Sequence, residues 1–501
     1  MNERCRSVAL RSKTGPVLAP ATTRAGRELP LVEELLPAPD PWPLVRRLAA
    51  LPHLLFFDSA YRHPSLGRYS FITADPFTWI RSRGPATHVS GAALPEQPAD
   101  PFAVLAQQLS HFHQDRIPDL PPFQGGAAGV FGYDLCHHLE RLPRPRTDEF
   151  QLPDLALGLY DWVIAFDHAA ERAWLIATGL PEQEPARRRQ RAEKRVAEIR
   201  RRLRQPAAEA RWTAPPPLAG LAEQWPVSGL DRLTSNFSRA SYLKAVQRAI
   251  DYIYAGDCFQ VNLAQRLLYP AVLPPLELYE KLRQRNQATF AAYFDAGDFV
   301  LASASPERFL RLDRGVVETR PIKGTRPRSS DPAEDERLKQ ELLASAKDRA
   351  ENIMIVDLLR NDLGRVCRYG SVQVAALCRL ETYRYVHHLV SAVRGDLRPG
   401  LGAIDLLRAA FPGGSVTGAP KIRAMQIIAE LEPTARGPYC GSLGYIGFDG
   451  TMDTNILIRT FTHSRGWIQF PVGGGIVADS DPQREYEETW QKAEGLLRAL
   501  G

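Results

Sequence analysis

The sequence predicts a fold that mixes helices and strands in more than one part. A chain of 501 residues, 44% of them hydrophobic, can bury a large core, and its length suggests roughly two to four units of ordinary size. Short apolar runs such as residues 54–57 and 69–72 have the length of buried strands. Apolar residues in 239–255 instead recur at helical spacing. Both kinds of element are therefore expected along one chain.

The first part of the chain is predicted from its apolar runs. Residues 1–28 carry several arginines and are expected to form a flexible N-terminal extension, although a transit peptide is conceivable. The glycine-rich segment 125–133 suits strands whose backbones approach closely. It lacks the lysine of a P-loop and the GxGxxG of a dinucleotide site. We expect a subdomain at 29–180 that uses neither motif.

A change in composition separates this part from the rest. Residues 182–211 are rich in arginine and alanine, and three prolines follow at 215–217. We expect a solvated helix and a linker over 181–233. The alternative of a nucleic-acid-binding segment is disfavoured because glutamates interrupt the arginines and stacking aromatics are lacking. The net charge of +6 is also modest for this length.

The second part, residues 234–501, is predicted as the chemically active unit. Residues 239–255 form an amphipathic helix that should end at Gly256, and a strand over 258–266 should follow. Further helices are expected at about 333–361, 403–410, 420–431 and 483–499, with strands between them.

The composition also predicts the compartment. No apolar run approaches the roughly 20 residues that a membrane helix needs. The six cysteines are scattered, without a CxxC pair or the spacing of metal ligands. A soluble protein of the cytoplasm, with no membrane and no nucleic-acid partner, is the expected class.

Three charged residues of the last predicted helix share one face. Glu485, Glu488 and Lys492 stand at i, i+3 and i+7, a spacing that also suits a surface ladder of ion pairs. The cluster Gly473-Gly474-Gly475 precedes them, and bare amides near a helix start suit an anion. Together these residues suggest a site of carboxylates and a metal ion.

Glu351 is a second kind of candidate. It lies at the edge of a strongly apolar helical run, where a carboxylate is costly unless it is paired or bound to metal. A structural ion pair is the competing interpretation. Because carboxylates from separate elements, with room for waters, are what Mg²⁺ prefers, Mg²⁺ is the expected cofactor.

Lys323 stands out because lysine is scarce. The chain has nine lysines among 63 basic residues. Charge alone is supplied by arginine, whereas an amine nucleophile that loses its proton must be lysine. Beside a Gly-Thr turn, a lysine is also typical of a solvated loop.

The order of motifs in this chain resembles that of chorismate-utilising enzymes. The resemblance covers residues 234–499 strongly and 30–170 more weakly, and its motifs are QVNL (260–263), SPERF (305–309), PIKGTR (321–326), RNDLGR (360–365), HHLVS (387–391), GAPK (418–421) and GGGIV (473–477). It implies an α+β fold in which two large antiparallel β-sheets pack together with flanking helices. Residues 29–180 would then be an N-terminal subdomain of the anthranilate synthase component I type, and 234–501 the chorismate-binding domain.

Among the branches of this family, the chain resembles component I of aminodeoxychorismate synthase. Lys323 carries that distinction, because anthranilate synthase component I, the alternative, normally has alanine there. Gln260 stands where water-adding relatives have a lysine base, and this disfavours hydroxylation. The implied product is 4-amino-4-deoxychorismate, for 4-aminobenzoate and folate biosynthesis. Ammonia would come from a glutamine amidotransferase subunit, since no cysteine of this chain lies in a glycine-flanked elbow.

The resemblance also implies roles for individual residues. Lys323 would be the nucleophile and Glu307 the general acid, although a salt bridge with Arg308 would also explain Glu307. Surrounding glutamates should raise the pKa of Lys323 and so oppose the neutral amine. The implied Mg²⁺ ligands are Glu351, Glu485 and Glu488. The implied substrate-binding residues are Gln260, Thr325, His388, Ser415, Tyr439, Arg459, Gly473, Gly474, Gly475 and Lys492. A remnant of a tryptophan site is implied at Ser59, Tyr69, Ser70 and Phe71, where plain core sheet is the alternative.

Overall fold

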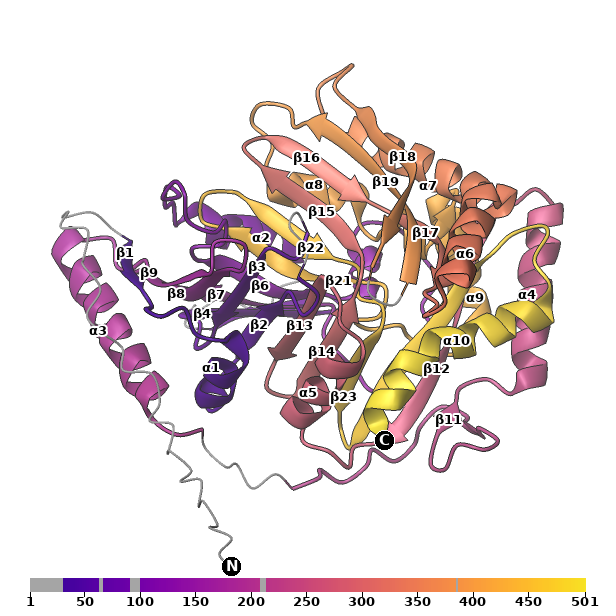
Figure 1. Ribbon diagram of the computed structural model, residues 1–501, viewed down its shortest axis with the longest axis horizontal. Helices are drawn as coiled ribbons and strands as arrows, with labels where there is room; N and C mark the ends of the chain where they lie inside the picture. The colour runs from indigo at the N-terminus through magenta and orange to yellow at the C-terminus, as the bar shows by residue number, and fades with distance from the viewer. Residues whose placement is uncertain (1–29, 63–65, 91–99, 208–212, 384–385) are drawn as a thin grey trace, which may run out of the picture.

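A computed structural model describes residues 30–62, 66–90, 100–207, 213–383 and 386–501 (Figure 1). The predicted N-terminal extension, residues 1–28, lies outside these residues. All the named strands of the described residues belong to two large sheets, whose paired strands run antiparallel. No described helix is long and apolar enough to cross a membrane.

The larger sheet, sheet A, has 13 strands. Their order is β1 (Leu31–Glu34), β9 (Arg172–Ala177), β8 (Trp162–Asp167), β3 (Tyr69–Thr73), β2 (Leu55–Asp58), β13 (Phe290–Asp295), β14 (Phe299–Ser305), β23 (Thr460–Ser464), β24 (Trp467–Ile476), β12 (Gln260–Pro270), β11 (Thr234–Ser235) and β10 (Trp225–Pro226), with β20 (Gly418–Ala419) paired to β12.

The second sheet, sheet B, has 11 strands. Their order is β17 (Ile322–Pro327), β19 (Val386–Asp396), β16 (Val316–Arg320), β15 (Arg308–Asp313), β22 (Met452–Asn455), β21 (Ser442–Gly447), β6 (Gly126–Phe131), β7 (Leu155–Tyr160), β4 (Thr78–Arg83) and β5 (Ala86–Val89), with β18 (Gln373–Thr382) also paired to β19.

The helices expected to begin at 239, 403, 420 and 483 begin within one residue of those positions, and several further helices were not predicted. The described helices are α1 (Pro41–Leu48), α2 (Pro101–Ser110), η1 (Tyr133–His138), α3 (Pro185–Arg204), α4 (Arg239–Tyr254), α5 (Pro275–Arg285), α6 (Pro332–Ala344), α7 (Ala346–Gly364), α8 (Ala403–Ala410), η2 (Gly414–Val416), α9 (Lys421–Leu431) and α10 (Pro482–Leu500). The single helix expected at 333–361 is wrong. Ser345 has an extended backbone and its side chain accepts the amide of Asp348, so it ends α6 and caps α7.

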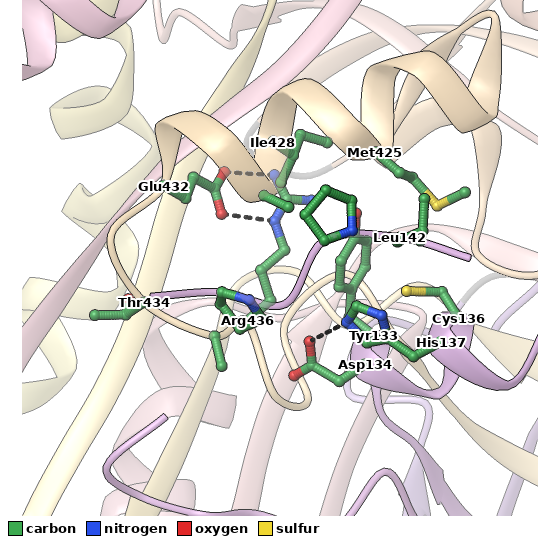
Figure 2. Close-up of a pocket in the computed structure, with 14 residues that line it drawn as sticks. Tyr133, Asp134, Cys136, His137, Leu142, Met425, Ile428, Glu432, Thr434 and Arg436 are labelled. Atoms are coloured by element: carbon green, nitrogen blue, oxygen red, sulfur yellow. Dashed lines mark hydrogen bonds and ion pairs between the residues drawn. The ribbon is translucent and has the colours of Figure 1, made fainter. Parts of the chain in front are cut away.

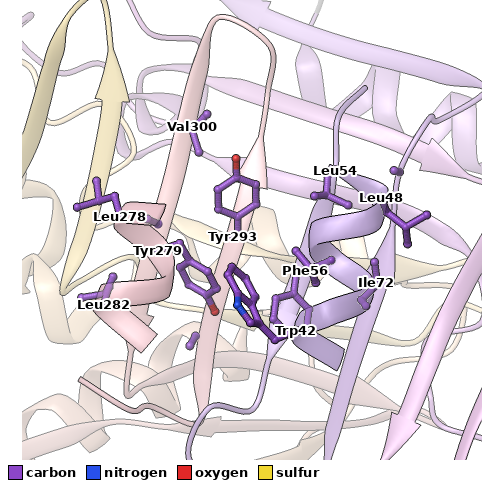
Figure 3. Close-up of a cluster of buried hydrophobic side chains, with 14 of the residues drawn as sticks. Trp42, Leu48, Leu54, Phe56, Ile72, Leu278, Tyr279, Leu282, Tyr293 and Val300 are labelled. Atoms are coloured by element: carbon purple, nitrogen blue, oxygen red, sulfur yellow. The ribbon is translucent and has the colours of Figure 1, made fainter. Parts of the chain in front are cut away.

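The core confirms that the two sheets pack together. Leu55 and Phe294 of sheet A are buried in one cluster with Val130 and Tyr445 of sheet B. The outer face of sheet A is covered by α1, α3, α5 and α10, and that of sheet B by α2, α7 and α8. Figure 3 shows the first of these outer cores, where the Trp42 ring of α1 lies 5.8 Å from the Tyr279 ring of α5. The layers are therefore helix, sheet, sheet, helix.

Both sequence segments contribute to both sheets. In sheet A, β2 pairs with β13, and in sheet B, β6 pairs with β21. The segments 29–180 and 234–501 thus share one framework, and α3 with the following linker connects them along the chain.

The arginines of α3 pair with carboxylates of the protein itself. Arg195 lies 3.3 Å from the buried Asp161, and Arg200 lies 2.6 Å from Glu33 of β1. These contacts attach the predicted solvated helix to the edge of sheet A, at the left of Figure 1.

Candidate active site

A bulge in β17 sets the position of Lys323. The pairing of β17 with β19 shifts register between Ile322 and Thr325. Gly324, inside the shift, has a φ of 83°, and a Cβ there would lie 3.0 Å from atoms of Leu342 and Asp348. A bulge re-aims the side chains beside it, and only glycine fits this turn against α6 and α7. Lys323 is thereby held at a fixed place at the edge of sheet B.

The surroundings of Lys323 lower its basicity. Burial lowers its pKa below the ordinary lysine value, and the charge of Lys492 adds to that effect. The carboxylates of Glu351, Glu307 and Glu488 act in the opposite direction. The expectation that the glutamates dominate was wrong, because desolvation of the ammonium outweighs their attraction.

Glu307 lies next to Lys323 between β14 and β15. Its residue is 5% exposed, and Oε1 accepts a hydrogen bond of 2.7 Å from Ser415 Oγ. The main-chain N–H of Ile322 also donates to its carboxylate. Burial nevertheless raises the pKa of Glu307 to about 7. A carboxyl group that is half protonated near neutral pH suits a general acid. The alternative salt bridge is not formed, since Arg308 pairs with Glu318 and Asp453.

Gln260 and Gly475 face each other where β12 pairs with β24. Gln260 is 1% exposed, and neither its Oε1 nor its Nε2 has a hydrogen-bond partner among the described residues. A Cβ on Gly475 would lie 1.9 Å from Gln260 Nε2 and 3.4 Å from Lys323 Nζ. The amide of Gln260 thus lies within a few ångströms of the lysine amine, with hydrogen-bonding capacity to spare.

The three glycines act through the space they leave. Gly473, Gly474 and Gly475 lie in β24, opposite residues 262–264 of β12, and α10 begins only at Pro482. Their expected place near a helix start was therefore wrong. A Cβ on Gly473 would lie 2.3 Å from the carbonyl oxygen of Leu263, so the two strands could not approach as they do.

The charged face predicted for the last helix points at Gly474. From the Cβ position of Gly474, Glu485 Oε2 is 3.2 Å away, Glu488 Oε1 3.4 Å and Lys492 Nζ 3.5 Å. The convergence predicted from the i, i+3 and i+7 spacing is confirmed. Lys492 Nζ lies 2.6 Å from Glu488 and donates to the Gly473 carbonyl at 2.8 Å. Burial alone would raise the pKa of Glu488, but Lys492 brings it below its usual value.

The carboxylates of α7 and α10 offer the donor types of a Mg²⁺ site. Burial raises the pKa of Glu351 and of Glu485, and each is raised further by acidic neighbours. Glu485 is 4% exposed, and its Oε2 has no hydrogen-bond partner. As placed, no three His, Cys, Asp or Glu side chains in the described ranges are gathered closely enough to hold a metal ion. Carboxylate oxygens of this kind suit a hard dication, and Glu485 Oε2 is a buried one that has no other partner among the described residues.

Tyr439 and Arg459 form another side of the site. Burial lowers the pKa of Arg459, whereas the nearby Tyr439 and Glu488 raise it. Arg459 has a φ of 53°, which is rare for a residue with a side chain, and its guanidinium donates to the Lys492 carbonyl. Strained backbones of this kind are retained where the surrounding structure fixes them, often at functional sites.

His388 and Thr325 are neighbours across the β17–β19 pair. Thr325 Oγ1 and His388 Nδ1 are 2.8 Å apart, and burial lowers the pKa of His388 to about 4. A histidine of that kind is neutral at pH 7. The adjacent His387 turns to Asp335, 2.9 Å away. Both histidines lie opposite β17, but it is the His388 side chain that meets a residue of that strand.

The residues expected as a tryptophan-site remnant divide between two environments. Ser59, Tyr69 and Phe71 line a cavity of about 110 Å³, together with polar groups such as Arg308. Ser70 points elsewhere and lies 2.7 Å from His168. Side chains alternate along β3, which explains the split. A role in binding an amino acid stays a prediction.

A smaller pocket lies apart from Lys323, between η1 and α9 (Figure 2). Its volume of about 20 Å³ is close to that of a single water site. Asp134 lines it, and burial raises the pKa of that carboxyl to about 7. The pocket is too small for a ring substrate.

Two residues that contact Glu485 were not predicted from the sequence. Ser480 Oγ donates to Glu485 Oε1 at 2.6 Å, and Lys347 Nζ lies 3.6 Å from the same carboxylate. Lys347 is one of the nine lysines, and this scarcity could have singled it out. Ser480 gave no signal beyond its place before a helix.

Known proteins resemble this chain over most of its length. The family model described as chorismate binding enzyme matches residues 67–498. Anthranilate synthase component 1 of Thermus thermophilus is 46% identical over 401 residues, which cover 80% of this chain and 82% of the relative. Aminodeoxychorismate synthase component 1 of Salmonella typhimurium is 43% identical, covering 87% and 90%.

Solved structures agree with the fold. Anthranilate synthase component I of Streptococcus pneumoniae superposes with a TM-score of 0.73 at 33% identity, covering 86% of this chain and 92% of that one. The menaquinone-specific isochorismate synthase of Escherichia coli has a TM-score of 0.68 at 20% identity, covering 97% of both chains, and supports the fold alone. With motifs, sheets and relatives in agreement, the chain belongs to the chorismate binding enzyme family.

Proposed function

We propose that this chain is component I of an aminodeoxychorismate synthase, converting chorismate and ammonia to 4-amino-4-deoxychorismate. The observation that carries the proposal is the amine of Lys323. It lies beside Glu307 and Gln260, and burial lowers its pKa. A lysine with lowered pKa next to a carboxyl group of raised pKa is an arrangement suited to nucleophilic and acid catalysis.

Lys323 is the proposed nucleophile. Its neutral amine forms a bond to C2 of the ring, both ring double bonds shift, and the C4–oxygen bond breaks. The departing hydroxyl takes the proton of Glu307 and leaves as water. Ammonia then attacks C4, both double bonds shift back, and the C2–nitrogen bond to Lys323 breaks. Two such allylic displacements restore the original ring pattern.

The substrate carboxylates would be held by residues on the sheet A side of the site. Arg459 can make a two-pronged contact with a carboxylate, and Lys492 supplies a point charge. Tyr439, Ser415, Thr325 and His388 supply neutral hydrogen-bonding groups, and the glycines of β24 leave room for the ring. The unpaired amide of Gln260 would hydrogen-bond to the substrate in place of water.

Mg²⁺ is the proposed cofactor, with Glu351, Glu485 and Glu488 as its ligands. When bound, it would neutralise a substrate carboxylate and the negative charge of these side chains. Chelation should therefore lower the thermal stability of the protein as well as its activity. A melting temperature that does not respond to Mg²⁺ would count against this ligand set.

A separate glutamine amidotransferase is the proposed partner. The relatives are named component 1, and such a name implies a second component. The purified chain should aminate chorismate with ammonium and without glutamine. Glutamine should act as the nitrogen source only after the partner is added.

Anthranilate synthase component I is the second candidate, because the relative of 46% identity carries that name. The two activities differ in the product. Purified chain, chorismate, Mg²⁺ and ammonium should yield 4-amino-4-deoxychorismate, identified by chromatography and mass spectrometry. Anthranilate as the main product would overturn the proposal. Without ammonia, an adduct of chorismate on the intact protein should form and be absent in Lys323→Ala.

A further inference from the structure

A buried ion pair lies on the segment that follows α9. Arg436 and Glu432 are 6% and 5% exposed, and two hydrogen bonds join them, Nε to Oε2 at 2.9 Å and Nη2 to Oε1 at 2.6 Å (Figure 2). A fully buried pair of this kind is weak evidence for stability, because desolvation offsets the attraction. Its remaining hydrogen bonds show what else it does.

The pair binds three main-chain groups. Arg436 Nη1 donates to the carbonyl of Val416 at 3.0 Å, and Nη2 donates to the carbonyl of Asn262 at 2.7 Å. Glu432 Oε1 accepts the amide of Ala264 at 2.9 Å. One buried pair thus joins η2 to β12, two elements far apart in sequence.

These are the elements that hold two of the proposed site residues. Ser415, which donates to Glu307, precedes Val416. Gln260 is two residues before Asn262 on the same strand, and side chains two apart share one face of a strand. The Arg436 guanidinium also lies over the Tyr439 ring, 5.6 Å from its centroid. None of these contacts places Arg436 itself against the substrate site.

We propose that Glu432 and Arg436 are positioning residues, which hold η2 and β12 in the register that brings Ser415 to Glu307 and Gln260 to Lys323. The inference rests on the proposed function only for its catalytic consequence. Its structural part, that the pair fixes these two backbones, can be tested without any reaction.

The first variant is Arg436→Lys. Lysine keeps the charge but cannot reach the Glu432 carboxylate and two carbonyls at once, because it lacks the planar fork. Arg195→Lys is the matched control. Arg195 is also a buried arginine with several partners, Asp161 at 3.3 Å and Asp75 at 2.7 Å, but it lies on α3.

Amide hydrogen exchange tests the structural part. In Arg436→Lys, peptides covering 411–419 and 260–266 should exchange at least tenfold faster than in the wild type, with little change elsewhere. Arg195→Lys should leave both peptides as they are. Unchanged exchange in both peptides of Arg436→Lys would overturn the inference, whether or not the wild-type protein turns over chorismate.

The pH profile of kcat/KM with ammonium tests the catalytic part. Ser415 donates to the ionised form of Glu307 and so lowers its pKa, which means that losing this bond raises it. In Ser415→Ala, the pH at which kcat/KM falls on the alkaline side should rise by about one unit, the size expected for one hydrogen bond to a charged group. Arg436→Lys should produce the same shift, and the double variant should shift no further.

Two results would contradict the catalytic part. One is an Arg436→Lys enzyme whose melting temperature falls, as that of Arg195→Lys does, but whose pH profile of kcat/KM keeps the alkaline limb of the wild type. The other is a double variant whose shifts add, since additive shifts show that Arg436 does not act through Ser415. A wild-type protein without chorismate turnover would refute the proposed function, and the exchange experiment would still decide the positioning role.

Discussion

A methyl group added at Gly475 should disable the site without unfolding the protein. In Gly475→Ala the new Cβ would lie 1.9 Å from Gln260 Nε2, about 1.6 Å inside the ~3.5 Å separation of atoms in contact. The neighbour that must move is the end of a side chain, so the backbone of β24 can stay in place. Crowding of this type costs about 1–3 kcal/mol of stability.

The expected loss of activity is larger than the loss of stability. The new Cβ displaces the Gln260 amide beside Lys323 Nζ, which would lie 3.4 Å from that Cβ, and a misplacement near 1 Å can cost about 100-fold in rate. The assay is ammonium-dependent turnover of chorismate beside a thermal melt. Gly364→Ala is the control, because a Cβ there would meet nothing within 4 Å and Gly364 lies outside the site.

A third variant tests the cause. Gln260→Ala removes the amide that the new methyl group strikes, so Gln260→Ala/Gly475→Ala should regain most of the melting temperature that Gly475→Ala loses. If the double variant is less stable than Gly475→Ala, or if Gly475→Ala turns over chorismate like the wild type, the steric reasoning is refuted.

Four further outcomes are expected. Lys323→Met, which keeps most of the length of the side chain but not the amine, should abolish amination. It should leave the free energy of unfolding no more than about 1 kcal/mol below the wild-type value, or raise it, because burying an amine is costly. Glu307 must be protonated to act and its pKa is about 7, so kcat/KM should fall as pH rises through 7. In Glu307→Gln, kcat/KM should be low and should not change with pH over this range. Folding raises the pKa of Glu307 from 4.5 to about 7, so this residue should lower the free energy of unfolding as pH rises between those values. Urea titrations of Glu307→Gln should lack this pH dependence. Ser345→Ala should lose about 1 kcal/mol of unfolding free energy in the same titrations, as the cap of α7 is removed, with Ser330→Ala as an exposed serine control.

Local patterns allowed much of the site to be predicted. The spacing of Glu485, Glu488 and Lys492 on one helix face places their side chains together because helix geometry is regular. The helix over 239–255 follows from its apolar period in the same way. The break at Ser345 was missed because the helical pattern continues on both sides, and a single capping hydroxyl ends it.

Contacts between distant segments could not be predicted in this way. The pairing of β2 with β13 joins residues more than 230 positions apart, and no local period encodes such a register. The place of the β24 glycines was misjudged for the same reason, since only the folded chain shows that Gly475 makes room for Gln260 and that Gly473 lets β24 approach β12. The pair of Glu432 and Arg436 stands at an ordinary i, i+4 spacing, and its main-chain partners are visible only in the fold.

The sign of the Lys323 pKa shift bears most directly on the proposed chemistry. Counting carboxylates along the sequence predicts an ammonium held charged, whereas burial in the folded site favours the neutral amine. Burial also keeps Glu307 protonated up to about pH 7, and a protonated Glu307 has no charge with which to stabilise the Lys323 ammonium. The two groups are therefore coupled, because protonation of Glu307 makes the Lys323 ammonium easier to deprotonate. Each of the two states that the reaction needs, a neutral amine and a protonated acid, thus removes a charge that would oppose the other.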